Sequence, residues 1–119
     1  MTAWVVDWLR AFGLTLAAEA LVAVPLLRRS GAGLGRRLAA VLFANLTTHP
    51  LVWFLFPALT VGYPTRLAVS ETFAVGLESC AYLVIWPGLG PRRAVLVSVL
   101  ANAASVAVGL ALRTAHLLP

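Results

Sequence analysis

The stretch Asn45-Leu46-Thr47-Thr48-His49-Pro50 lies inside a run from 38 to 65 that contains no Lys, Arg, Asp or Glu. A run of 28 residues exceeds the roughly 20 that a helix needs to cross a bilayer. Amide, hydroxyl and imidazole groups at the middle of such a helix need polar partners from other helices. Pro50 lacks an N–H and frees the carbonyl of Leu46, so we expect a bend beside His49 and partial satisfaction of that carbonyl by Thr47 or Thr48.

The composition of the whole chain is that of an integral membrane protein. Of 119 residues, 61% are hydrophobic and 11% are charged, and the mean hydropathy is +0.95, whereas a soluble domain is about half apolar and a quarter charged. All nine basic residues are Arg, and with four acids they give a net charge of +5. Six of these Arg lie in two short connections between apolar runs, where membrane topology explains them, so nucleic-acid binding is not expected.

Four membrane-spanning helices are predicted from the charge-poor runs, at about 3–27, 37–58, 67–86 and 92–113. Gly and Pro mark the connections near 31–35, 60–66 and 87–93, and the glycines of the first are expected to exclude helix there. Because short connections make consecutive helices antiparallel, we expect an all-α integral membrane fold. It is a single domain, 1–119, forming an antiparallel, up-down-up-down bundle of four transmembrane helices. No internal repeat is convincing, although the two helix pairs resemble each other weakly.

The arginine distribution predicts the orientation in the membrane. The first and third connections share one side and hold six Arg: Arg28, Arg29, Arg36, Arg37, Arg92 and Arg93. The opposite side holds Arg10, Arg66 and Arg113. The side richer in Arg is expected in the cytoplasm, with the N- and C-termini outside, in a bacterial-type inner membrane. The start of the chain lacks the basic residues of a signal peptide, so the first helix is expected to be retained.

Each predicted helix carries one polar stripe at helical spacing. Asn45 and His49 are i, i+4, and Glu71 and Glu78 are i, i+7 on one face of the third helix. Because a lipid-facing Glu costs at least a few kcal/mol near the bilayer centre, all four stripes are expected to face inward. The candidate substrate- or ion-binding residues are Glu19, Asn45, His49, Glu71, Glu78, Asn102 and Ser105.

Glu71 has two interpretations. It lies about 10 Å above Glu78 along the helix, towards the outside, so the two acids are the first steps of a possible path for protons or cations. Alternatively, Glu71 is a first-turn residue of a helix that begins at Ser70, where the helix dipole favours an acid.

Three functions are compatible with this cluster. The first is a small membrane transporter or channel for a cation, with the charge carried by Glu19 and Glu78. His49, Asn45 and Asn102 then act as neutral ligands or proton carriers. The second is an intramembrane enzyme or metal site. Glu19, His49 and Glu78 then hold a divalent metal ion, or Glu78 or His49 acts as general acid or base on a lipid-like substrate. The third is an accessory membrane subunit whose polar stripe docks a partner helix.

The charge balance favours the transporter, because no Arg or Lys lies at the depth of Glu19 and Glu78 to neutralise them. Four thin helices enclose little volume, so a permeation path is expected at an oligomer interface, most simply that of a homodimer. In its size, its four helices and the glutamate of its first helix, the chain resembles the small multidrug resistance transporters. No further sequence pattern matches that family, and the six-to-three Arg bias differs from the dual orientation of some of its members.

Overall fold

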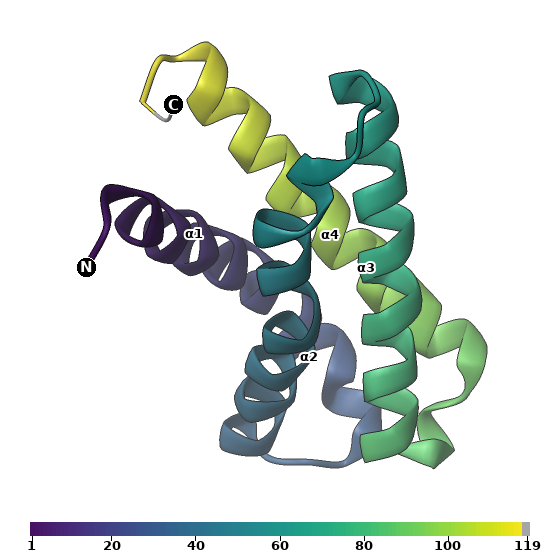
Figure 1. Cartoon of the computed structure of the whole chain (residues 1–119). Coiled ribbons are helices and arrows are strands. Elements are labelled where there is room, and N and C mark those ends of the chain that lie inside the picture. The colour runs from purple at the N-terminus through teal and green to yellow at the C-terminus, as the bar shows by residue number, and fades with distance from the viewer. Residues whose placement is uncertain (118–119) are drawn as a thin grey trace.

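The structure is a computed structural model that describes residues 1–117, and it is helical with no strand in that range. The four long helices in Figure 1 are α1 (Ala3–Leu26), α2 (Leu34–Phe54), α3 (Tyr63–Ile85) and α4 (Pro91–Thr114). Short 3-10 turns, η1 (Leu27–Ser30), η2 (Phe56–Ala58) and η3 (Pro87–Leu89), follow the first three. All four helices are long and apolar enough to cross a membrane. The prediction of an all-α chain with four helices of this kind is confirmed.

The helices α2 and α3 begin earlier than the sequence predicts. α2 starts at Leu34, with Gly33 as its N-cap and Gly35 in its first turn. The expectation that the glycines exclude helix was therefore wrong for Gly35, because the first turn makes few intrahelical bonds and is weakly constrained. α3 starts at Tyr63 with a proline in its first turn, where a missing N–H costs nothing. Glu71 consequently lies more than two turns inside α3, and it is not a first-turn residue.

The four helices pack in a ring in which α1 contacts α2 and α4, and α3 also contacts α2 and α4. Figure 1 shows α2 and α3 side by side and α4 passing diagonally across them. The turns η1 and η3 contact each other, so the first and third connections lie at one end. We call this the arginine end, and we call the other, where α3 begins, the Tyr63 end. The longest dimension, 39 Å, is close to the thickness of a bilayer with its headgroups.

The half of the molecule nearer the arginine end is a packed apolar core. Its buried side chains come from all four helices and from η1: Ala23, Val24, Leu27, Ala40, Val41, Ala44, Ala81, Tyr82, Ala94, Val97 and Ala101. In every helix these residues lie on the arginine side of the central polar groups. The polar interior is therefore confined to the centre of the bundle and the half towards the Tyr63 end.

Two arginines of the arginine end bind the carboxyl end of α1. Arg37 Nη1 donates to the carbonyl oxygen of Val24 at 2.6 Å, and Arg93 Nη2 donates to that of Leu26 at 3.1 Å. The last carbonyls of a helix have no intrahelical partner, and a cation there also interacts favourably with the helix dipole. These bonds tie the starts of α2 and α4 to the end of α1.

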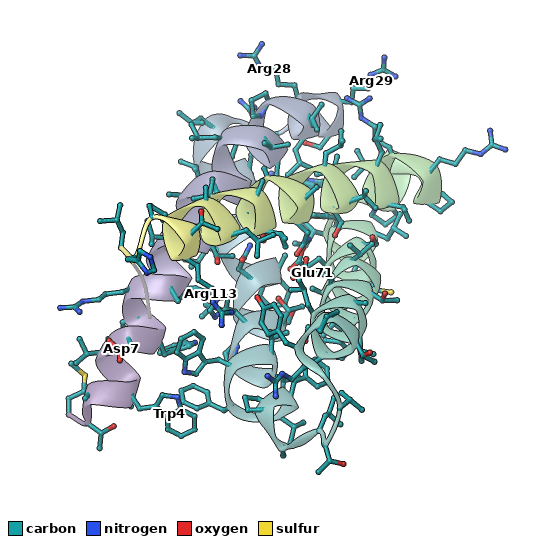
Figure 2. The ribbon with its side chains drawn as sticks, turned by 90° about the horizontal axis from the view of Figure 1, so that it is seen from above. Trp4, Asp7, Arg28, Arg29, Glu71 and Arg113 are labelled. Atoms are coloured by element: carbon teal, nitrogen blue, oxygen red, sulfur yellow. The ribbon has the colours of Figure 1, made fainter. Side chains whose placement is uncertain are left out.

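Replacing Arg37 with Gln is expected to lower the stability of the protein by about 1–3 kcal/mol, because a charged donor to a buried carbonyl is lost. Thermal unfolding in detergent measures the change. The matched control is Arg28→Gln, since Arg28 is exposed and extends away from the bundle in Figure 2. Equal effects of the two substitutions would show that only the loss of positive charge matters.

Candidate functional site

Two buried carboxyl groups, Glu19 of α1 and Glu78 of α3, lie at the centre of the bundle. Each residue is only 1% exposed, and both line a cavity of about 190 Å³. Neither forms an ion pair; the one salt bridge within residues 1–117 joins Asp7 and Arg10 at the surface, at 3.8 Å. Burying a carboxylate is costly unless a charge or hydrogen bonds compensate it. The bonds that these two groups accept therefore define the site.

Glu19 accepts one bond from each of two other helices. Asn45 Nδ2 of α2 donates to Glu19 Oε2 at 2.7 Å, and Ser105 Oγ of α4 lies 3.2 Å from Oε1 in donor geometry. The single proton of Ser105 is shared between Glu19 and the carbonyl of Asn102, which lies 3.0 Å from the same hydroxyl. The second amide hydrogen of Asn45 goes to the carbonyl of Val41, four residues earlier, at 3.1 Å. Glu19 thus links three helices through its two oxygens.

Glu78 is held in the same way with one additional donor. Asn102 Nδ2 of α4 donates to Glu78 Oε2 at 2.7 Å, and Thr48 Oγ1 of α2 donates to Oε1 at 3.0 Å. Asn102 also donates to the carbonyl of Ser98, four residues earlier, at 2.9 Å. The additional donor is Ser98 Oγ, 3.2 Å from Oε2.

The two carboxyl sites are related as two copies of one arrangement. In each copy the Glu accepts a bond from the Asn of the helix that follows it in the chain: Glu19 of α1 from α2, and Glu78 of α3 from α4. It accepts a second bond from a hydroxyl group of the other pair of helices: Glu19 from α4, and Glu78 from α2. The two Asn are the twelfth residues of α2 and α4, and the hydroxyls of Thr48 and Ser105 belong to the fifteenth. The sequence Ala-Asn-x-x-Thr/Ser accordingly recurs at 44–48 and 101–105. This repeat is the signal that the sequence analysis missed.

The cavity runs from the two carboxyl groups towards the Tyr63 end. Tyr63 and Leu110 line it and are 42% and 41% exposed, so it reaches the surface there. Glu71 lines it nearer that end and is half-buried. Seen from above in Figure 2, Glu71 and Arg113 lie on the inner sides of their helices. The guanidinium carbon of Arg113 is 4.7 Å from the centre of the Tyr63 ring, at the mouth of the cavity.

His49 lines the cavity from an aromatic cluster between α1 and α2. Trp8 Nε1 donates to His49 Nδ1 at 3.1 Å, and the rings of Phe12 and Trp53 lie 5.3 and 6.3 Å from the imidazole. An imidazole that accepts at Nδ1 is neutral and carries its proton on Nε2. Trp8 therefore fixes the orientation of His49.

The three residues expected to hold a metal ion do not form a metal site together. Within residues 1–117, no three His, Cys, Asp or Glu side chains are close enough to bind one ion. His49 is engaged by Trp8, while the oxygens of Glu19 and Glu78 accept bonds from Asn, Ser and Thr. A His-containing set suited to Zn²⁺ or Fe²⁺ is therefore not present in the described chain.

All seven candidate residues from the sequence line the one cavity: Glu19, Asn45, His49, Glu71, Glu78, Asn102 and Ser105. Thr48 joins them as a direct donor to Glu78, and its position three residues after Asn45 is the helical spacing that could have predicted it. The expectation that Thr47 or Thr48 satisfies the Leu46 carbonyl was wrong. Thr47 donates to the carbonyl of Ala44 at 2.6 Å. The acceptors near the Thr48 hydroxyl are Glu78 Oε1 at 3.0 Å and, further away, the carbonyls of Asn45 and Ala44.

Comparisons with known proteins give no match for this chain: no family model, no curated protein and no solved structure matches it. The chemistry of the cavity follows from its donors and acceptors. The amide hydrogens of Asn45 and Asn102 are all used, while their side-chain oxygens accept no bond from residues 1–117. None of the lining residues is Arg or Lys. The cavity therefore presents oxygen acceptors and acidic groups, an arrangement that suits a cation.

The Asn45→Ala and Asn102→Ala variants are expected to lose similar amounts of stability, about 1–3 kcal/mol each, because each leaves one buried carboxyl without its shortest donor. Thermal unfolding of the purified protein measures both. Thr72→Ala is the control, since Thr72 is exposed and its hydroxyl bonds only within its own helix. A large loss for one Asn and none for the other would contradict two equivalent halves.

Proposed function

We propose that this chain is a small membrane transporter or channel for a cation and that the central cavity is its binding site. One observation carries the proposal: Glu19, Glu71 and Glu78 line a single cavity that has no Arg or Lys in its wall. Ionisable groups inside a membrane are costly and usually mark ion or substrate paths. A bound cation, or protons in its absence, offsets that cost.

The hydrogen bonds hold the acidic groups of the site in fixed positions. Both oxygens of Glu78 accept bonds from donors on neighbouring helices, and the Nδ1 atom of His49 accepts the Trp8 N–H. A carboxyl group has more acceptor sites than the bonds that Glu78 accepts from the chain. Its oxygens can therefore also meet a cation, or the water around it, in the cavity.

The position of the polar groups favours a site inside one chain over a docking surface. Glu19 and Glu78 are 1% exposed, and their partners come from the other helices of the same chain. A partner helix arriving from the lipid therefore meets apolar side chains rather than the polar stripes. For the same reason the proposed site does not depend on the homodimer expected from the sequence, and its cavity is complete in one copy.

A carrier agrees better with this structure than an open channel. The cavity reaches the surface at the Tyr63 end, whereas Tyr82, Val41 and Val97 are 0% exposed on the arginine side of the carboxyl pair. A cation can reach the site from one end while apolar packing blocks the other. Transport then requires the arginine half to open in a second conformation.

We place the arginine end in the cytoplasm of a bacterial-type inner membrane, with both termini outside. Six Arg lie at that end, and cytoplasmic connections carry the excess of Arg and Lys. The contacts of Arg113 with Tyr63 and of Trp4 with Phe54 put the end of α4 and the start of α1 near the Tyr63 end. These contacts support the antiparallel, up-down-up-down order of spanning helices in the proposal.

Uptake into proteoliposomes tests the transport proposal, with Na⁺, K⁺, Mg²⁺, Mn²⁺ and ethidium as the cations offered. At least one is expected to accumulate with the wild-type chain and to lose most of its uptake with Glu19→Gln or Glu78→Gln. The control is Asp7→Asn, which removes a carboxylate that lies at the surface and pairs with Arg10. Uptake that persists in both Glu variants, or is absent for every cation, would refute the proposal.

Thiol labelling tests the orientation in a Cys80→Ser background, since Cys80 is exposed and free. Val61→Cys lies in the exposed connection between α2 and α3, and Gly88→Cys lies in η3. A membrane-impermeant maleimide is expected to label the first in intact cells and the second only after permeabilisation. The reverse pattern would place the arginine end outside.

A further inference from the structure

We infer that the two carboxyl sites together bind one hard divalent cation of the Mg²⁺ class, held between Glu19 and Glu78 with part of its water shell. This inference rests on the proposed function and names the class of cation. It starts from the duplicated arrangement, in which two matching halves face one cavity. An ion at their common centre receives the same set of ligands from each half.

The ligand set consists entirely of oxygen. Each half brings a carboxylate, a side-chain amide oxygen and a hydroxyl, in the order Glu19, Asn45 and Ser105 for one half and Glu78, Asn102 and Thr48 for the other. Carboxylate, amide and water oxygens suit Mg²⁺, Ca²⁺ and Mn²⁺, whereas thiolates and imidazoles suit softer ions. The composition of the site therefore favours a hard ion.

The amide oxygens point to a ligand in the cavity independently of the acidic groups. Asn45 is 1% and Asn102 is 5% exposed, both line the cavity, and their Oδ1 atoms accept no bond from the described residues. Neither oxygen is among the buried polar atoms without a partner, so both are open to the cavity. Because both amide nitrogens are fixed by bonds to Glu and to a helix carbonyl, a cation or its water in the cavity is the partner that these oxygens can take.

Charge and volume agree with a divalent, hydrated ion. Two ionised carboxylates carry the charge that one dication balances, and no basic lining residue competes for them. The cavity of about 190 Å³ has room for roughly six water molecules at about 30 Å³ each. Mg²⁺ loses its water reluctantly and usually keeps several molecules in protein sites.

Other classes of cation fit less well. An organic ammonium is usually held against aromatic faces, and Tyr63, which lines the mouth, already has the Arg113 guanidinium 4.7 Å from its ring centre. A softer metal would need His49, whose Nδ1 is occupied, or Cys80, which is exposed and does not line the cavity. Neither set is available at the carboxyl pair.

Glu71 stands outside the duplicated set. It precedes Glu78 by seven residues, and the residue seven before Glu19 in α1 is Phe12. Because Glu71 lies between the carboxyl pair and the mouth of the cavity, its charge attracts a dication on the way in without being one of the paired ligands.

Binding of Mn²⁺ to the purified protein in detergent, followed by its paramagnetic resonance signal and displaced by Mg²⁺, tests the inference. One Mn²⁺ per chain is expected. Glu19→Gln and Glu78→Gln are each expected to weaken binding at least tenfold, since even outer groups around a metal change affinity by about 10–100-fold. The two losses should be similar, and Asp7→Asn should bind as the wild type does.

The wild-type protein gives a decisive result even if a Glu variant fails to fold. Zn²⁺ binding that displaces Mn²⁺ and depends on His49, or binding of K⁺ or ethidium without Mn²⁺, overturns the hard-ion inference and leaves the cation proposal standing. Mn²⁺ binding by the wild type that survives both Glu variants, with each shown to be folded by circular dichroism, overturns it as well. If no cation binds and none enters proteoliposomes, both proposals fail.

Discussion

The structure depends on the cost of burying two carboxyl groups among apolar helices without a basic side chain. Glu19 and Glu78 are 1% exposed, and every compensating bond that they accept from the chain is a neutral one from α2 or α4. If α2 or α4 rotates about its axis, one carboxyl group loses the hydrogen bond from an Asn amide and the other loses the bond from a hydroxyl group. The rotational setting of α2 and α4 is thereby fixed at the depth of the site, where apolar packing alone would allow several settings.

The duplication explains why the helices pack in a ring. In two equivalent halves, α3 corresponds to α1 and α4 corresponds to α2. The contact of α1 with α4 then has its counterpart in the contact of α3 with α2, and the structure contains both. The starts of α2 and α4 match, each following a glycine N-cap, Gly33 or Gly90. The halves differ where Ser98 adds a donor that Val41 cannot supply, and where His49 corresponds to Val106. The common part holds the residues that bond the two carboxyl groups, and the differences lie around it.

Much of the candidate site was predictable from the sequence because its residues are chemically out of place. Glu19, Asn45 and Glu78 lie in apolar helices, and helical spacing correctly gathered them with the other four candidates around one cavity. Spacing along one helix, however, says nothing about rotation against a neighbour. It therefore missed that Thr48 donates to Glu78 while Asn45 donates to Glu19.

His49 shows the limit of reading a polar residue by its depth alone. Depth suggested a ligand of the carboxyl pair, but the ring is fixed by an indole N–H from α1, a partner 41 residues away in the sequence. The starts of α2 and α3 were predicted several residues too late for a local reason. A Gly or Pro in the first turn of a helix costs few hydrogen bonds, so it does not prevent the helix from starting there. The contact between Trp8 and His49 could not be read from the sequence, because it joins two different helices.

Tyr82 connects the site to the closed half of the molecule. It lies four residues beyond Glu78 on the arginine side, is 0% exposed, and its hydroxyl has no partner among the described residues. A buried hydroxyl without a partner costs about 1–3 kcal/mol, so this packing is more easily opened than an all-apolar core of the same size. This cost falls beside the buried carboxyl groups, at the boundary between the polar centre of the bundle and its apolar half.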